Sequence, residues 1–137
     1  MKIIDQYEWT AAEGEFKNDY LKPIGFKNIQ RPDWIAEYNG IWYSFEIKCK
    51  EPFQPSPFDG SDKILPNGGH GLNRYQLLSR LQLEESTGIK AVLVVKDPVL
   101  GWIGAPMNEL IAGPHYITRN NIVIFPVESF KPLKPAL

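Results

Sequence analysis

The chain has 137 residues, the length of one domain, and its 43% hydrophobic and 23% charged side chains exclude a disordered protein. Its 15 basic and 16 acidic residues leave a net charge of −1, which excludes a polybasic tail or a strongly basic nucleic-acid-binding coat. No apolar run approaches the roughly 20 residues that span a bilayer, and the N-terminus lacks the apolar stretch of a signal peptide. We therefore expect a soluble, cytoplasmic protein.

The first predicted element is a helix from Thr10 to about Lys22. Thr10 can cap its start, and Pro23 is expected to stop it. Apolar side chains recur at spacings of three and four and form one stripe: Trp9, Ala12, Phe16 and Tyr20. Gly25 then turns the chain, and residues 26–30 are predicted to form a first strand.

Asn39-Gly40 predicts a two-residue hairpin loop between segments 34–38 and 41–48, which are rich in aromatic and β-branched side chains. This loop places Asp33 directly opposite Glu46. Because side chains alternate between faces, one face is predicted to join the core: Trp34, Ala36, Tyr38, Ile41, Tyr43, Phe45 and Ile47. The other face carries the charged residues together with three uncharged ones: Asp33, Ile35, Glu37, Trp42, Ser44, Glu46 and Lys48.

Residues 51–71 contain four prolines and four glycines without clear periodicity, which predicts a long functional or mobile loop. A second helix is predicted over 72–86, with Gly88 as its C-cap. Helical spacing relates four of its positions: Leu72, Tyr75, Leu78 and Leu81 or Gln82. The continuously apolar run 91–95 predicts a strand that is buried on both faces.

The remaining segments are predicted to form a short helix at 106–112, a strand at 121–125 and an irregular, proline-rich tail. The order of helix, three strands, helix and strand predicts a mixed α/β fold. We expect one domain over the whole chain, with a core at about 10–96 and a C-terminal extension at 97–137.

The predicted hairpin gathers two carboxylates and a lysine at the open end of one face. Like charges directly opposite each other, as at Asp33 and Glu46, destabilise a sheet, and a bound divalent cation would reverse that penalty. Hard oxygen ligands suit Mg²⁺ or Mn²⁺, and Lys48 shares the face of Glu46. The alternative is a turn residue after Pro32 and a surface ion pair in the β-strand. We favour the metal site, because the register brings the two acids together.

Pro32-Asp33 and Glu46-Ile47-Lys48 resemble the signature of the PD-(D/E)XK nuclease superfamily, whose core has the order α-β-β-β-α-β. The resemblance covers roughly Thr10 to Lys96 and implies a restriction-endonuclease-like core, with a mixed central sheet flanked by helices. The chain is similar to archaeal-type Holliday junction resolvases and phage nucleases in four segments: Ala12-Glu13-Gly14-Glu15-Phe16, Gly25-Phe26, Gly88-Ile89 and Ala91–Lys96. A prokaryotic or phage-encoded protein is implied.

The resemblance also implies roles for the residues of the signature. Asp33 and Glu46 would be metal ligands, with the backbone carbonyl of Ile47 as a further ligand. Lys48 would orient or activate the attacking water, or stabilise charge that develops on phosphorus. The implied chemistry is metal-dependent hydrolysis of a phosphodiester, in which the cation lowers the pKa of a bound water.

A glutamate of the first helix completes the site in many members of the superfamily. Glu13 is preferred because it flanks the apolar stripe, Glu15 is the second choice, and a solvated helix face is the alternative for both. Gln76, one turn before Arg80, matches a glutamine that positions the scissile strand in several of these families; a plain polar position is the alternative. Four basic residues are candidates for phosphate contacts, each with a solvated charge as the alternative: Arg74, Arg80, Lys50 and Lys63.

The cysteine and the histidines give little support for a catalytic or metal-binding role. A single cysteine, Cys49, excludes an internal disulfide, and its position on the face opposite Lys48 predicts a buried packing residue. His70 and His115 lack the spacing of a zinc site. His70 could touch substrate or metal, but without a neighbouring histidine we favour a loop residue with no chemical role.

The leading hypothesis is therefore a Mg²⁺- or Mn²⁺-dependent DNA endonuclease, selective for DNA structure as junction resolvases are. One alternative is a non-catalytic nucleic-acid-binding or assembly module on the same fold, and another is a hydrolase of RNA or of a different phosphoester. The near-zero net charge argues against a nucleic-acid partner, although a metal would neutralise the acids of the site. We expect modest, salt-sensitive DNA affinity unless a homodimer pools two basic surfaces.

Overall fold

The structure is a computed structural model that describes residues 11–30, 35–49, 52 and 65–133, without the side chains of residues 11–13, 30 and 49. The N-terminal elements are α2 (Ala11–Phe16), the π-helical turn η1 (Lys17–Leu21), α3 (Lys22–Ile24), β1 (Lys27–Gln30), β2 (Ile35–Tyr38) and β3 (Ile41–Cys49). They are followed by β4 (Gly69–Asn73), α4 (Arg74–Thr87), β5 (Lys90–Asp97), β6 (Gly101–Pro106) and α5 (Met107–Ala112). The chain continues with β7 (Tyr116–Ile117), β8 (Ile122–Pro126), the 3₁₀ turn η3 (Val127–Ser129) and β9 (Lys131–Pro132).

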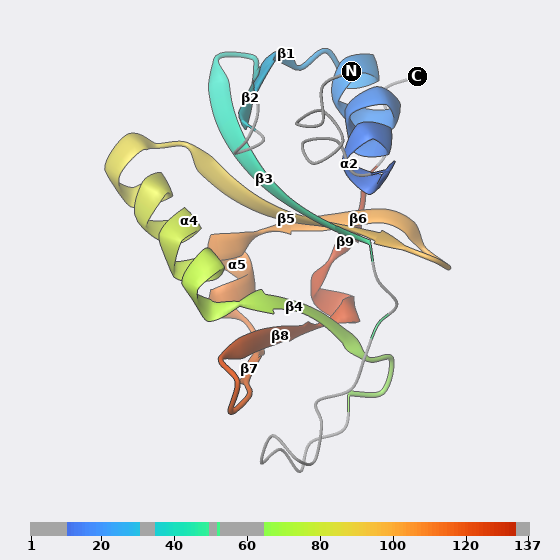
Figure 1. The fold of residues 1–137 in the computed structure, drawn as a ribbon, viewed down its shortest axis with the longest axis vertical. Helices are drawn as coiled ribbons and strands as arrows, with labels where there is room; N and C mark the ends of the chain where they lie inside the picture. The colour runs from blue at the N-terminus through green and yellow to red at the C-terminus, as the bar shows by residue number, and fades with distance from the viewer. Residues whose placement is uncertain (1–10, 31–34, 50–51, 53–64, 134–137) are drawn as a thin grey trace, which may run out of the picture.

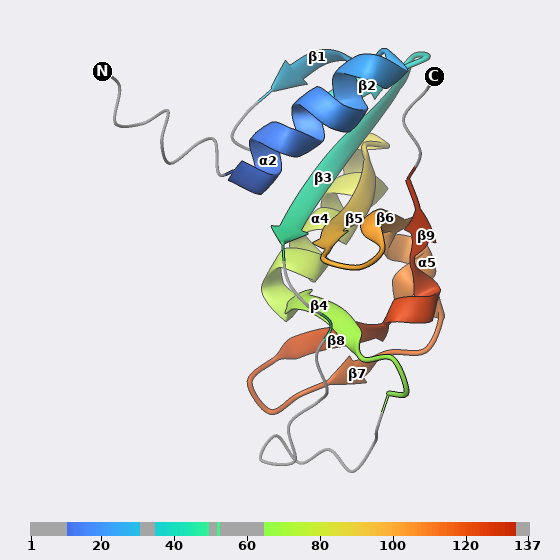
Figure 2. The same cartoon turned by 90° about the vertical axis from the view of Figure 1, so that its right-hand side faces the viewer.

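A six-stranded mixed sheet forms the centre of the molecule, in the order β1-β2-β3-β5-β6-β9. Its strands pair antiparallel except for β3 and β5, which run parallel and are joined through α4. The helix α2 covers one face of this sheet, and α4, α5 and a second sheet of order β4-β8-β7 lie on the other (Figures 1 and 2). This arrangement confirms the predicted mixed α/β fold. None of the helices in the described part of the chain is long and apolar enough to span a membrane.

The first helical segment extends two residues beyond its predicted end. Pro23 lies inside the final turn, and the segment ends at Gly25, whose φ of 103° is in the left-handed region that glycine adopts without strain. The strand predicted at 26–30 is β1, with a register shift between Lys27 and Gln30 where it pairs with β2.

The predicted hairpin is confirmed in position and register. Asn39 and Gly40 have φ of 52° and 80°, as a tight loop between twisted strands requires. Tyr38 pairs with Ile41, and Ile35 pairs with Ser44 at the last described position of β2. The predicted pairing of Asp33 with Glu46 would be the next same-face step, but residues 31–34 lie outside the described part of the chain.

The second helix differs from its prediction in its start and in its buried face. It begins at Arg74, with the Asn73 side chain accepting a hydrogen bond from the Tyr75 N–H at 2.8 Å. Leu72 is a buried residue of β4, whereas Tyr75 and Leu78 are 77% and 45% exposed. The predicted apolar stripe was counted from Leu72, which lies before the helix, and it therefore included exposed positions. The face that packs on the sheet contains Leu77 and Leu81, and Gly88 caps the helix as predicted.

The end of the predicted 51–71 loop is instead a strand. Residues 69–73 form β4 and pair antiparallel with β8 along their whole length. At Gly71 an added Cβ would lie 2.3 Å from the Val123 carbonyl oxygen, so the two backbones approach more closely than a side chain permits. The tail is also less irregular than predicted, because β9 pairs with β6.

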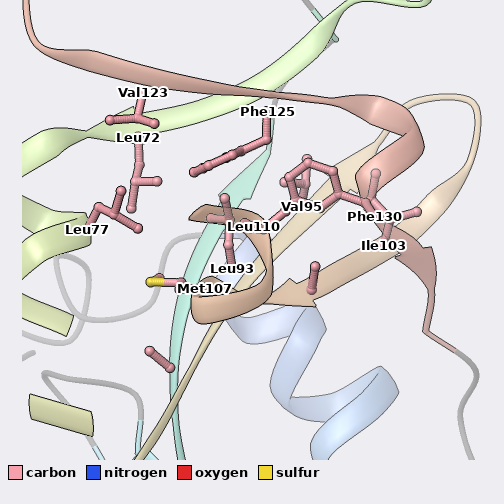
Figure 3. Close-up of a cluster of buried hydrophobic side chains, with 12 residues drawn as sticks. Leu72, Leu77, Leu93, Val95, Ile103, Met107, Leu110, Val123, Phe125 and Phe130 are labelled. Atoms are coloured by element: carbon pink, nitrogen blue, oxygen red, sulfur yellow. The ribbon is translucent and has the colours of Figure 1, made fainter. Parts of the chain in front are cut away.

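Two hydrophobic clusters pack against the two faces of the six-stranded sheet. On the α4 face the cluster is mostly aliphatic and joins both sheets, as Figure 3 shows for Leu72, Leu93 and Val123. On the α2 face the cluster is built around Phe16 and Phe45. The strand β5 contributes buried residues to both clusters, which confirms the prediction that it is buried on both faces.

Candidate active site

The strand β3 places Glu46 and Lys48 on the α4 face of the central sheet. Glu46 pairs with Leu93 and Lys48 with Val95 on the parallel strand β5, and both of those neighbours belong to the aliphatic cluster. Phe45 and Ile47 point to the opposite face and pack in the aromatic cluster. The apolar alternation thus fixes the direction in which the two charged side chains project.

Glu46 lies between two cations in a partly buried position. Its Oε2 atom is 3.9 Å from Lys48 Nζ, and its Oε1 atom accepts a hydrogen bond from Arg80 Nη2 at 3.5 Å. The side chains of Glu46, Lys48 and Arg80 are 18%, 28% and 16% exposed. The three groups form a charged cluster that is shielded on one side by α4, where electrostatic interactions are stronger than on an open surface. Arg80 is therefore not the freely solvated charge considered above.

Gln76 occupies the turn of α4 that precedes Arg80, and it is exposed. The helix runs antiparallel to β3, because Gly88 reverses the chain into β5 and β5 is parallel to β3. Four helical residues advance about 6 Å, close to the roughly 6.6 Å between alternate strand residues. Gln76 thus lies at the level of Lys48, as Arg80 lies at the level of Glu46.

The helix glutamates stand in a different relation to this cluster. Glu15 forms an ion pair with Lys96, which also lies over the Trp102 ring at 5.7 Å. Lys96 alternates with Val95 on β5, so this ion pair is on the α2 face of the sheet, away from Glu46 and Lys48. Glu13 is in α2, but its side chain lies outside the described residues.

Other predicted residues stand apart from the cluster or outside the description. Asp33, Lys50 and Lys63 lie outside the described residues, as does the side chain of Cys49. Arg74 is exposed at the start of α4. In the described part of the chain no group of three or more His, Cys, Asp and Glu side chains lies together. The described donor, the Glu46 carboxylate, is of the hard oxygen type that Mg²⁺ and Mn²⁺ select.

A buried pair of His70 and Asp97 was missed by the sequence analysis, which interpreted His70 as a loop residue. His70 is in β4, and its Nε2 atom donates a hydrogen bond to Asp97 Oδ2 at 3.2 Å. The two side chains are 3% and 2% exposed. Burial lowers the pKa of His70, although the hydrogen bond and charge of Asp97 oppose this. The pair joins the second sheet to the end of β5.

Asp97 also ties down the turn between β5 and β6. Its Oδ1 atom accepts hydrogen bonds from the Val99 and Leu100 N–H groups at 2.8 and 3.0 Å. Burial raises the pKa of Asp97, but these two bonds and the one from His70 outweigh burial and hold the pKa below its usual value. The partner of His70 is 27 positions away, so no local sequence signal pointed to it.

The cluster on β3 combines a carboxylate with a partly buried lysine and arginine. A carboxylate can hold a metal ion, and a partly buried lysine can stabilise negative charge that develops on a phosphoryl group. The Ile47 carbonyl lies in the backbone between these two residues, while its side chain is buried on the other face.

No protein-family model matches this chain, and no curated protein matches it. Among solved structures, its fold is similar to that of Hjc, a Holliday junction resolvase from the archaeal hyperthermophile Archaeoglobus fulgidus. The superposition has a TM-score of 0.57 at 16% sequence identity and covers 85% of this chain and 88% of that chain. At this identity the likeness shows the fold: a central mixed sheet flanked by helices, as predicted.

Proposed function

We propose that this protein is a metal-dependent DNA endonuclease that selects branched DNA, such as a four-way junction. The observation that carries this proposal is the placement of Glu46 and Lys48 on one face of β3, 3.9 Å apart, in a chain whose fold is similar to that of a junction resolvase. An isolated Glu-x-Lys sequence is weak support, because short motifs are common. The partly buried geometry and the fold together make the support specific.

The residues have distinct roles in this proposal. Glu46 and Asp33 would hold Mg²⁺ or Mn²⁺, with the Ile47 carbonyl and Glu13 as further ligands, and the cation would supply an activated water and polarise the phosphoryl oxygen. Lys48 would hold its ammonium against the charge that develops on the phosphoryl group. Gln76 would position the scissile strand from α4.

In this proposal Arg80 can pair with either the Glu46 carboxylate or a DNA phosphate. In the described structure it donates to Glu46, and this ion pair balances the charge of the carboxylate. A cation on Glu46 would repel Arg80, and a DNA phosphate would attract it, so Arg80 would move from the acid to the substrate. Lys50, Lys63 and Arg74 are further candidates for phosphate contacts.

The test is cleavage of labelled four-way junction, flap, linear duplex and single-stranded DNA in Mg²⁺, Mn²⁺ or EDTA. We expect metal-dependent cleavage that is fastest on branched DNA, and a loss of about 10²- to 10³-fold in Lys48→Ala, as for other groups that stabilise developing charge. Lys90→Ala is the matched control, because Lys90 is an exposed lysine at the opposite end of the paired strand.

Folded protein that cleaves none of these substrates would contradict the proposal. Metal-independent binding of DNA in that case would support the non-catalytic module instead. Cleavage of RNA in preference to every DNA substrate would retain the chemistry but reject DNA as the polymer.

A further inference from the structure

A hollow lies on the α2 face of the sheet, on the side opposite Glu46 and Lys48. Its volume is about 470 Å³, within the range of about 300–1,000 Å³ that small-molecule sites occupy. Phe45 and Val92 form part of its floor, and Gly104 and Leu133 also line it. The end of the first helical segment and β9 form its walls.

Aromatic rings line this hollow and are only partly covered. Phe26 is the central ring, with its centroid 5.1 Å from that of Tyr38 and 5.7 Å from that of Tyr43. Tyr20 continues the row, with a centroid 6.2 Å from Phe26. These rings are half-buried, and those of Tyr20, Phe26 and Tyr43 also pack against the aromatic cluster. They offer π-surfaces on which a planar ring can stack, with rigid side chains that lose little entropy on binding.

The hollow also carries hydrogen-bonding groups and one cation. The Tyr20 phenol can donate and accept hydrogen bonds; burial raises its pKa, and the neighbouring Tyr43 and Tyr38 add to this. Lys131 pairs with Gly104 on β6 and stands exposed at the rim. None of the described residues that line the hollow is acidic. The charge at the rim is therefore suited to an anion.

We propose that this hollow binds a nucleotide, with the base stacked among the aromatic rings and the phosphate paired with Lys131. The tyrosine hydroxyls would bond the edge of the base. Aromatic stacking combined with a basic group is how proteins bind unpaired nucleotides without reading sequence. The nucleotide comes either from the 5′-phosphorylated end of a single strand or from a free mononucleotide.

The site is tested by calorimetric titration in EDTA, so that binding is measured without cleavage. The ligands are deoxyadenosine 5′-monophosphate, deoxyadenosine, deoxyribose 5-phosphate, and a short single strand with and without a 5′-phosphate. We expect the mononucleotide to bind more tightly than either of its halves. A strand end is the source if the phosphorylated oligonucleotide binds more tightly than the mononucleotide, and a free nucleotide is the source if the order is reversed.

Two variants connect the binding to the hollow. Lys131→Gln should weaken mononucleotide binding by up to about fivefold, the range of an exposed ion pair, and leave deoxyadenosine binding unchanged. Arg119→Gln removes an exposed cation from the loop between β7 and β8 and should change neither. Val92→Phe should abolish binding by filling the hollow, and its thermal unfolding shows whether the variant is folded.

Absence of mononucleotide and strand binding at millimolar concentration would overturn the proposal. Binding that survives in folded Val92→Phe, or that Lys131→Gln and Arg119→Gln weaken equally, would overturn it as well. The hollow lies on the face of the sheet opposite Lys48, and Lys131→Gln and Val92→Phe leave the charged residues of β3 in place. The nucleotide site and the endonuclease can therefore fail independently of each other.

Discussion

The face of the central sheet under α2 is filled by aromatic rings, whereas the face under α4 is filled by aliphatic side chains and carries the charges of β3. Phe16 stands at the centre of the aromatic face, with its ring centroid 5.3 Å from Phe45 and 5.2 Å from Trp102. On the other face Leu93 and Val95 pack closely beside Glu46 and Lys48. One strand, β3, serves both faces by alternation.

The difference shows how one sheet can support two kinds of surface. Aliphatic side chains interdigitate closely, so charged groups at the edge of that cluster are held in fixed positions by the packing below them. On the α2 face, partly buried aromatic rings line a hollow of about 470 Å³. The charged pair of β3 and this hollow therefore lie on opposite sides of the sheet.

The largest expected effect comes from removing the charge that we place at the centre of the α4 face. Glu46→Gln keeps the shape of the side chain and its ability to accept from Arg80, but it removes the negative charge with which Glu46 would hold a metal ion in the proposed mechanism. We expect metal-dependent cleavage of branched DNA to fall by about 10²- to 10⁴-fold, with the fold unchanged. Initial rates measure this, beside Glu85→Gln as a control on the exposed surface of α4. Full activity in Glu46→Gln would remove this residue from the site.

Truncation of a buried ring on the aromatic face should destabilise the protein far more than truncation of an exposed ring. Phe16 is fully buried and touches three other aromatic rings, so Phe16→Ala should lower the free energy of unfolding by about 3–5 kcal/mol. Tyr75→Ala is the control, because Tyr75 is largely exposed and should change stability by no more than about 0.5 kcal/mol. Urea unfolding measures both. Similar losses in the two variants would show that the aromatic cluster is not a core.

Two glycines, one on each side of the sheet, should respond to alanine in opposite directions. Gly71→Ala would force a Cβ against the Val123 carbonyl and separate β4 from β8. We expect this to lower the free energy of unfolding by about 1–3 kcal/mol. Gly14→Ala, in α2, has open space for the added carbon and should stabilise the helix by about 0.5–1 kcal/mol. Urea unfolding of the pair tests the close approach of the strands. Stabilisation by both substitutions would contradict it.

The sequence predicted the elements that rest on local signals. Asn39-Gly40 fixed the hairpin and its register, because few residue pairs adopt that loop without strain. Gly88, which ends α4, and the apolar run of β5 were also local sequence signals. The fold class followed from the order of these elements. The direction of Glu46 and Lys48 also followed, since alternation along β3 determines it.

The elements that were missed depend on partners distant in sequence. Gly69 and Gly71 have low strand propensity, and β4 exists because β8 accepts a strand without side chains at those points. Which face of α4 is buried depends on where the helix begins after β4, and helical spacing alone does not specify that position. Whether Asp33 and Glu13 complete the site stays a prediction.

The smallest expected effect is the dependence of stability on pH, because a single buried pair on the α4 face produces it. Burial lowers the pKa of His70 in the folded state below the ordinary value of 6.5, so the unfolded chain binds a proton more readily. Stability from this group is present above pH 6.5 and is lost as the pH falls from there towards the lowered pKa of the folded state. The lowered pKa of Asp97 acts in the same direction below its ordinary value of 3.8.

Urea unfolding between pH 8 and pH 5 isolates the histidine, since Asp97 titrates below that range. In His70→Gln the loss of stability over this range should shrink, although the variant is less stable at every pH because the glutamine packs less well against Phe130. His115→Gln is the control, because it removes a second histidine from the exposed loop before β7. A His70→Gln profile with the original slope would place the proton uptake elsewhere. The buried pair would then join the two sheets without sensing pH.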